Sequence, residues 1–352
     1  MSAASLSPES RAASGAATGI FVLLGVGALY AGSALLRPVA FAVLFMFLLG
    51  PLVRWLRARG MREGIAAAVV VFGAVGVLGA GVTLLSGPAS AWVKSAPAVL
   101  TKVERRMRTL MRPLSSLQRT AERIDDATTP GSGAPSAPTS SPGLLATLGS
   151  GTLSAAASTL TVIFLTYFLL ASGRLFRAKI QRMASGPEQR EHLATALTEI
   201  EGHMSRYLLL NTIIGLVVGA ATWGLLAWVG LPNAPLWAAA AFVLNFVPYV
   251  GALATLVLIA VASLVTFDDT SKLFYATGGF FVINLIEGNL VTPMILGSRM
   301  PLNSVAIFTG LLFWSFVWGV PGAIIAVPLT VMIQVICAHT ERWKRLGVLL
   351  DN

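Results

Sequence analysis

Residues 230–254 read GLPNAPLWAAAAFVLNFVPYVGALA and lie in the middle of a stretch without charge that runs from Tyr207 to Phe267. A transmembrane helix needs roughly 20 consecutive, mostly apolar residues, so a stretch of this length holds two. The Gly-Leu-Pro-Asn sequence at 230–233 is typical of a turn. It divides the stretch into two predicted spans, the fifth and the sixth of the chain.

The rest of the composition agrees with a membrane protein. Of the 352 residues, 55% are hydrophobic and only 11% are charged, whereas about 25% of a soluble domain is charged. Further uncharged runs cover residues 12–36, 64–93, 127–173 and 300–340. The sequence therefore predicts an all-α fold, a polytopic membrane helix bundle of about eight transmembrane helices. The predicted spans are 18–36, 38–53, 64–86, 144–172, 207–229, 236–267, 272–296 and 302–338, with the first two separated by a break at Arg37–Pro38.

Two segments between the spans have helical periodicity but are not apolar enough to cross a bilayer. Hydrophobic residues recur every three or four positions over 100–117, interrupted by Pro113, and again over 193–204. We expect amphipathic helices outside the membrane there, the first kinked or split at Pro113. The predicted division is 1–87 with spans one to three, 88–143 with an extramembrane amphipathic helix and a flexible linker, 144–172 with span four, 173–205 with cytoplasmic amphipathic helices, 206–338 with spans five to eight, and 339–352 as a cytoplasmic basic tail.

Basic residues predict the orientation. Four arginines lie between 54 and 62, and four basic residues lie between 174 and 182. Short loops rich in Lys and Arg stay in the cytoplasm, so both termini are predicted to be cytoplasmic. Residues 88–143 would then lie outside although they contain eight basic and four acidic residues, which is acceptable because the rule is weak for long loops.

Proline and glycine interrupt the last three spans. Proline removes a backbone donor and clashes with the preceding turn, and irregular backbone in a membrane is tolerated where it contacts protein or a water-filled cavity. Broken helices of this kind often form midplane binding sites. The residues predicted to break the helices are Pro248, Gly251, Pro293, Gly319, Pro321, Gly322 and Pro328.

A polar cluster lies in the seventh span, within INLIEGNLVTPMILG at 283–297. A carboxylate at the centre of a membrane costs about 2.5–3.5 kcal/mol on insertion scales, so it is expected to face a polar interior or to stay protonated. One interpretation is a substrate or ion site, and the other is a hydrogen-bonded tie between helices. The predicted pathway residues are Glu287, Asn284, Asn289, Asn245 and Thr292.

These same segments resemble the AI-2E family of bacterial inner-membrane transporters, which is named for export of the quorum-sensing signal autoinducer-2. The resemblance is specific over about 205–336. It rests on Gly-Leu-Pro at 230–232, Pro-Tyr-x-Gly at 248–251, Thr-Pro-x-x-x-Gly at 292–297, and the Gly-x-x-Gly to Ala-Val-Pro stretch at 319–328. Two residues depart from the family pattern, because Ala252 replaces a common proline and Pro321 is additional.

The resemblance implies a multi-pass protein of the bacterial inner membrane that exports a small polar molecule such as autoinducer-2. It also implies a homo-oligomer, such as a pentamer. Because family members are associated with sodium–proton antiport too, the alternative is a cation–proton antiporter that uses Glu287. The partners expected are the lipid bilayer and a small-molecule or ion substrate.

Other function classes are not favoured by the residues present. No Walker A motif, HExxH element, paired membrane aspartates or Ser-His pair occurs, so we expect neither ATP hydrolysis nor catalytic residues. Cys337 is the only cysteine and the three histidines are scattered, which predicts no disulfide, metal site or cofactor. The net charge of +10 comes mostly from residues that flank apolar segments, and this predicts membrane topology signals, with no nucleic-acid partner.

Overall fold

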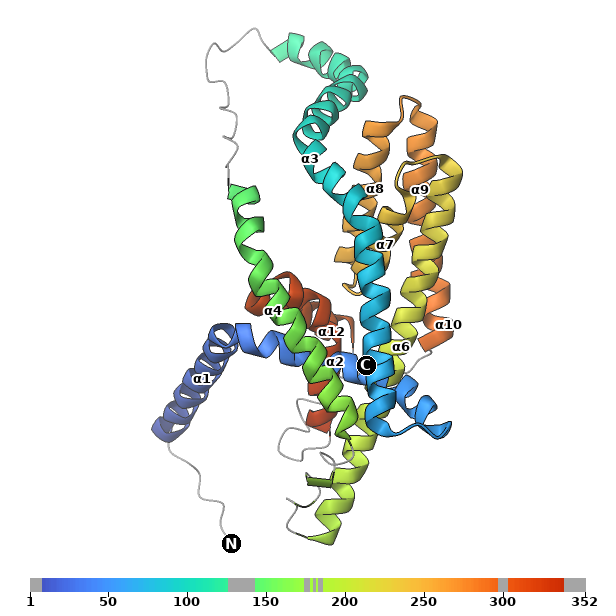
Figure 1. Cartoon of the computed structure of the whole chain (residues 1–352). Helices are drawn as coiled ribbons and strands as arrows, with labels where there is room; N and C mark the ends of the chain where they lie inside the picture. The colour runs from blue at the N-terminus through green and yellow to red at the C-terminus, as the bar shows by residue number, and fades with distance from the viewer. Residues whose placement is uncertain are drawn as a thin grey trace. The chain divides into compact units, whose positions relative to one another are not determined.

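A computed structural model of the chain describes residues 8–125, 143–173, 178–179, 182, 186–296 and 303–338, and these are helical with short connections (Figure 1). The described residues contain no β-strand, which confirms the all-α fold. The predicted linker after residue 125 and the tail after residue 338 lie outside the described residues. The helices are α1 (Pro8–Ala31), α2 (Ser33–Ala58), α3 (Glu63–Asp125), α4 (Gly143–Ala171), α6 (Pro187–Val229), α7 (Ala234–Leu244), α8 (Val250–Thr266), α9 (Thr270–Ile286), the π-helix η1 (Glu287–Val291), α10 (Thr292–Leu296), α11 (Ser304–Trp318) and α12 (Val320–Ala338).

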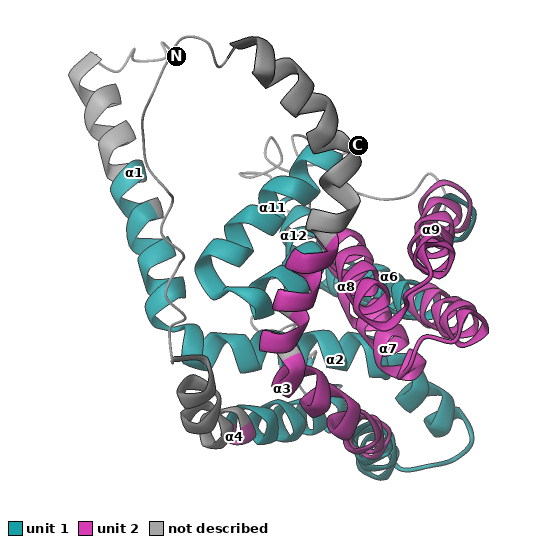
Figure 2. Ribbon diagram, turned by 90° about the horizontal axis from the view of Figure 1, so that it is seen from above, with its two compact units in different colours: residues 1–75, 158–213, 293–352 teal, residues 76–157, 214–292 magenta. Residues whose placement is uncertain are grey.

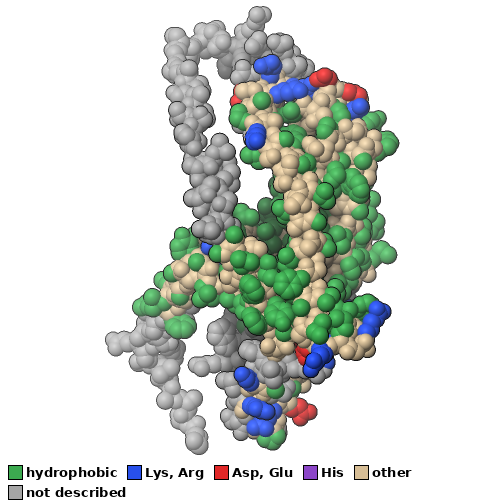
Figure 3. Space-filling model, in the orientation of Figure 1, with side chains coloured by type: hydrophobic (Ala, Val, Ile, Leu, Met, Phe, Trp, Pro, Cys, Tyr) green, Lys and Arg blue, Asp and Glu red, His purple; other side chains and the backbone are tan. Residues whose placement is uncertain are grey.

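The long helices have the length and surface of membrane spans. By length and apolar composition, the helical segments at 33–58, 63–95, 189–229 and 270–295 can each cross a bilayer. Many large hydrophobic side chains on them are exposed, among them Phe72, Leu84 and Trp223, as expected of surfaces that contact lipid tails. Figure 3 shows hydrophobic side chains over the middle of the long helices, with charged side chains near helix ends. The prediction of a polytopic membrane helix bundle is confirmed.

The helices in the N-terminal two thirds differ from the predicted spans in where they begin and end. The break between the first two helices is at Gly32, not at Arg37–Pro38, and Pro38 lies inside α2. Pro38 is the sixth residue of α2 and removes only the one hydrogen bond that its N–H would donate, so the helix continues through it, whereas glycine at position 32 disfavours the helix directly. Likewise, α3 continues through Pro113, and α6 joins the predicted surface helix and the fifth span in one helix.

The chain forms two compact units, coloured separately in Figure 2. Unit 1 comprises residues 1–75, 158–213 and 293–352, and unit 2 comprises residues 76–157 and 214–292. In unit 1, α11 and α12 pack against each other and against α2. The Trp318 indole donates a hydrogen bond of 3.0 Å to the carbonyl of Leu29, which ties α11 to α1. A hydrophobic core joins α2, the start of α3 and the end of α4 through Val53, Ala66, Ala67, Val70, Val71 and Leu170.

The predicted eighth span is a helical hairpin. Gly319 has φ of +67° and ψ of −145° and joins α11 directly to α12. A Cβ at Gly322 would lie 2.0 Å from the carbonyl oxygen of Trp314, and one at Gly310 would lie 2.3 Å from the Thr330 hydroxyl. Because Trp314 and Gly310 precede the turn while Gly322 and Thr330 follow it, the two helices run antiparallel. The prediction of a single span at 302–338 is therefore wrong, since glycines let the backbone reverse and pack closely.

The predicted sixth span is a second hairpin, in unit 2. Helix α7 has 11 residues and α8 has 17, and they pack against each other after a turn at 245–249. At this turn Tyr249 has a positive φ of 61°. A Cβ at Gly251 would lie 1.8 Å from the carbonyl oxygen of Leu244. Both arms are shorter than the roughly 20 residues needed to cross a bilayer, so the predicted single span at 236–267 is also corrected.

The core of unit 2 holds this hairpin to its neighbours. The buried residues Leu226, Val229, Leu231, Ala234, Trp237, Ala241, Ile259, Ala262, Ala276 and Phe280 form one cluster, which joins the end of α6 to α7, α8 and α9. The rings of Trp237 and Trp92 meet edge to face, 4.9 Å between centroids. Hairpin α7–α8 is therefore attached to α3, α6 and α9 by apolar packing.

The extension of α3 contacts the C-terminal end of α8. The Lys102 ammonium donates to the carbonyl of Val265, and the Arg106 guanidinium contacts the carbonyl of Phe267 and the carboxylate of Asp268. Cations are favourable at a helix C-terminus, where carbonyls lack partners. These residues must lie on one side of the membrane. Eight alternating crossings would instead place residues 88–143 outside and residue 268 inside, so the hairpin also corrects the predicted topology.

Candidate functional site

The predicted polar cluster lies where α9 changes into the π-helix η1. The backbone N–H of Thr292 donates to the carbonyl of Glu287, five residues earlier, which is the hydrogen-bond spacing of a π-helix. The same five-residue spacing brings the Thr292 hydroxyl to 2.5 Å from the Glu287 carboxylate. Pro293 follows and has no N–H to donate. The wider turn thus brings Glu287 and Thr292 together, and π-turns inside α-helices frequently occur at functional sites.

The two amides beside Glu287 are bonded within their own helix. Asn284 Nδ2 donates to the carbonyl of Phe280 at 3.0 Å, and Asn289 Nδ2 donates to the carbonyl of Leu285 at 2.9 Å. Within the described residues, no hydrogen bond from Asn284, Glu287 or Asn289 reaches another helix of the bundle. A tie between helices requires such a bond, so the described residues give no support to the tie, and the site stays a prediction.

Exposure of the cluster supports the prediction of a site. Asn284 and Glu287 are half-buried and Asn289 is exposed, and only 6% of the most apolar part of the segment 270–295 is buried. Polar and ionisable groups at membrane depth are costly against lipid and normally face protein or water. We therefore expect water, substrate or protein to cover this face in the membrane.

Asn245 lies at the tip of the α7–α8 hairpin. It follows the last residue of α7, and its side-chain nitrogen would lie 3.5 Å from a Cβ at Gly215 of α6. A Cβ at Gly219 would lie 3.2 Å from the carbonyl of Ala238, so α7 packs on α6 where both glycines leave the surface open. Among the described residues, no hydrogen bond joins Asn245 to Glu287, Asn284 or Asn289. Sequence reasoning missed Gly215 and Gly219, although their Gly-x-x-x-Gly spacing is a known signal of close helix packing.

The predicted helix-breaking residues occupy three places. Pro248 lies in the turn of the α7–α8 hairpin, Gly251 lies in the first turn of α8, and Pro293 is the second residue of α10. Gly319, Pro321 and Gly322 form the reversal between α11 and α12, whereas Pro328 lies inside α12. Pro248 and Gly251 lie in unit 2, and the other five residues lie in unit 1. In each hairpin, a glycine lies where the backbone of the second helix comes closest to the backbone of the first.

Acidic and sulfur-containing residues do not gather into a metal site in the part of the chain that the structure describes, since no group of three His, Cys, Asp or Glu side chains comes together there. The polar groups at hand are one carboxylate, hydroxyls and amides. Hydroxyls and amides bind polar solutes through hydrogen bonds, and a carboxylate can also take up a proton. The arrangement is thus suited to binding and release.

Comparisons with known proteins point to the same class. The model of the AI-2E family transporter matches residues 20–342. The AI-2 transport protein TqsA of Escherichia coli K12 is 26% identical over 340 residues, which cover 95% of this chain and 94% of that protein. A candidate transport protein of the same organism, YhhT, is 26% identical over 95% of both chains. The candidate transport protein MT0215 of Mycobacterium tuberculosis is 27% identical over 83% of this chain and 79% of its own.

Proposed function

Because the chain belongs to the AI-2E transporter family, we propose that it is a secondary transporter that exports a small polar molecule such as autoinducer-2 across the bacterial inner membrane. The multi-pass helical architecture and the family establish a membrane transporter. The substrate is the proposal. It is supported by the printed name of TqsA, an AI-2 transport protein that aligns over almost the whole chain.

The observation that carries this proposal is the polar π-turn inside an otherwise apolar helix. Glu287 and Thr292 bond to each other, while Asn284 and Asn289 donate to their own helix. A neutral solute with several hydroxyl groups can form hydrogen bonds with such a set of acceptors and donors, and it needs no charge of its own to do so. Transporters commonly place substrate sites where helices are interrupted near the bilayer midplane, and η1 and the α7–α8 turn are interruptions of this kind.

The driving force proposed is a gradient of solute or of ions. The chain has no Walker A motif that would hold a nucleotide. Glu287 is the acidic residue of η1. We therefore propose that, if transport is coupled to protons or cations, Glu287 binds the coupling ion. We further propose that both termini are cytoplasmic and that the transporter assembles as a homo-oligomer.

Substrate counterflow in proteoliposomes tests this function. Vesicles loaded with unlabelled autoinducer-2 should accumulate labelled autoinducer-2 from outside faster than protein-free vesicles do, since a carrier exchanges solute across the membrane without net flux. Glucose and succinate, tested in the same vesicles, define the selectivity. Equal accumulation with and without protein would reject autoinducer-2 as the substrate, and exchange of another solute would replace it.

A further inference from the structure

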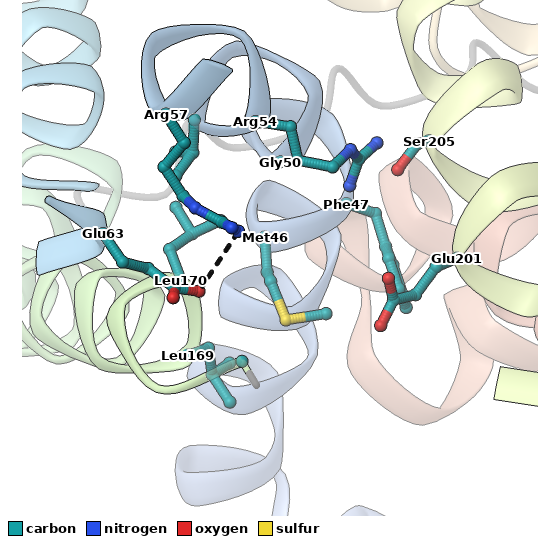
Figure 4. A pocket seen from close by; sticks show the side chains of 12 residues that line it. Met46, Phe47, Gly50, Arg54, Arg57, Glu63, Leu169, Leu170, Glu201 and Ser205 are labelled. Atoms are coloured by element: carbon teal, nitrogen blue, oxygen red, sulfur yellow. Dashed lines mark ion pairs between the residues drawn. The ribbon is translucent and has the colours of Figure 1, made fainter. Parts of the chain in front are cut away.

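A cavity of about 200 Å³ opens in unit 1 among α2, α4 and α6, together with the start of α3 (Figure 4). Its apolar side includes Phe47 and Leu170. Its polar side consists of Arg54, Arg57, Glu63, Glu201 and Ser205. None of these residues belongs to the pathway cluster around Glu287. The cavity is large enough for a small charged group, with apolar surface beside it.

Ser205 is the first sign that the cavity holds a ligand. Ser205 is only 4% exposed, and its hydroxyl oxygen has no hydrogen-bond partner among the described residues. A buried hydroxyl without a partner costs about 1–3 kcal/mol, and helix α6 could place an alanine there without this cost. Figure 4 shows the hydroxyl directed toward Arg54. The hydroxyl is thus positioned to donate to a group that enters the cavity.

Arg54 is the second sign, because its guanidinium lies beside Gly50 in the wall of the cavity. A Cβ at Gly50 would lie 3.2 Å from Arg54 Nη1, so the glycine lets the guanidinium fold back along α2 toward the cavity. Within the described residues, no carboxylate forms an ion pair with Arg54. Arg57, one turn later, is paired with Glu63 at 3.8 Å. Arg54 therefore has a guanidinium that can bind an incoming anion, and it is exposed to solution.

The neighbouring residues suit a membrane interface. Arg59 stacks over the ring of exposed Trp55, 3.5 Å from its centroid, and tryptophan and arginine are typical of the level of lipid headgroups. Glu201 also lines the cavity, and its charge opposes any anion bound there. The four charged side chains together are neutral, so binding depends on Arg54 and Ser205 and not on net charge.

We propose that this cavity is a phosphate-binding site, with the Arg54 guanidinium and the Ser205 hydroxyl as donors. The phosphate belongs either to the headgroup of an anionic phospholipid or to a free phosphate compound. Guanidinium groups bind phosphate through two parallel hydrogen bonds, and a hydroxyl adds a third. The apolar side formed by Phe47 and Leu170 is suited to the glycerol and first acyl carbons of a lipid.

Thermal unfolding of the purified full-length protein in dodecyl maltoside measures this binding. Cys337 is buried and is the only cysteine, so its reaction with a fluorescent maleimide reports unfolding. Phosphatidylglycerol and inorganic phosphate are titrated separately, against diacylglycerol and chloride as neutral-lipid and salt controls. A rise in Tm with phosphatidylglycerol alone assigns the site to a lipid, and a rise with inorganic phosphate assigns it to a free compound.

Four variants test the residues named. Arg54→Gln and Ser205→Ala should each weaken binding, the first by about tenfold or more because it removes a charged donor pair. Glu201→Gln should strengthen binding by a few-fold, since it removes a like charge. Arg59→Gln makes the same charge change as Arg54→Gln outside the cavity and should bind as the wild type does. Without ligand, Ser205→Ala should unfold at the wild-type temperature or above it, because the hydroxyl has no partner to lose.

Two results would overturn the proposal. The first is a Tm that responds to neither phosphatidylglycerol nor inorganic phosphate. The second is equal weakening by Arg54→Gln and Arg59→Gln, which would mean a nonspecific attraction to positive charge. Because counterflow of autoinducer-2 is not the readout, loss of the proposed transport function would leave this test unchanged.

Discussion

Glu287 shows how an apolar helix can contain a carboxylate that has no partner on another helix among the residues that the structure describes. The π-turn brings Thr292 under the carboxylate at 2.5 Å, so one oxygen accepts a hydrogen bond from the same helix. The carboxylate is still half-buried and can bind a proton or a solute. A carboxylate that accepts one hydrogen bond from its own helix can lose part of its hydration and can still bind a different partner during a transport cycle.

If Glu287 couples transport to an ion, Glu287→Gln should remove the pH or sodium dependence of counterflow. The amide keeps a hydrogen bond to Thr292 but cannot exchange a proton, so the protein should remain folded. Glu287→Leu should lower the free energy of unfolding by about 1 kcal/mol, because Thr292 loses its acceptor. Ion dependence that survives in the glutamine variant, measured in proteoliposomes with defined gradients, would remove Glu287 from the coupling mechanism.

Gly251 is a residue whose role is steric. A Cβ there would lie 1.8 Å from the Leu244 carbonyl oxygen, and this cannot be relieved without opening the hairpin. Gly251→Ala should therefore lower stability by about 1–3 kcal/mol. Gly278→Ala in α9 is the matched control, since nothing lies within 4 Å of its Cβ. If thermal unfolding shows the same Tm for both variants, the close approach in the turn is not present in the folded protein.

At the scale of helices, the contact between α3 and the end of α8 fixes which side of the membrane the hairpin returns to. Cysteines replacing Arg106 and Asp268, in a Cys337→Ser background, should be joined by a short bismaleimide. The reason is that the two side chains are in contact in the folded protein. Peptide mass spectrometry detects the link. Cysteines at Arg106 and Val250 define the background, because Val250 begins the 17-residue helix α8 and lies roughly 24 Å along the helix from its C-terminal end. A yield no higher than this background would contradict the hairpin.

How much of this architecture is predictable from sequence depends on what the pattern encodes. Apolar runs and basic loops give the lengths of the apolar segments and the positions of polar residues. From these patterns we predicted the bundle, the turn at 230–233 and the polar cluster. Proline and glycine report only that a helix is interrupted. Whether the chain then bends or reverses depends on contacts across the turn, such as Gly322 with Trp314 and Gly310 with Thr330, and a residue pattern does not show these contacts. The π-turn depends on backbone bonding at Glu287 and Thr292, for which composition gives no signal.

For the molecule as a whole, two hairpins change the topology and keep both predicted ends in the cytoplasm. Each hairpin enters and leaves the membrane on the same side. Replacing two crossings by two hairpins therefore leaves an even number of crossings, and both ends stay on one side of the membrane. We expect a cysteine at Ser271 to react with a membrane-impermeant maleimide from outside intact cells. A cysteine at Arg62 should react only after the membrane is opened. Reaction of both from the same side would contradict the hairpin topology.

The proposed export of a polar solute requires that water reaches the interrupted helices of unit 2, at η1 and at the α7–α8 turn. The most direct measurement is the rate at which a cysteine at Asn245 reacts with a charged methanethiosulfonate in proteoliposomes, compared with a cysteine at Val257. Val257 is an apolar, exposed position on α8, as expected of a surface against lipid. We expect faster modification at position 245, with block of autoinducer-2 counterflow. A rate at position 245 no higher than at position 257 would contradict the proposal.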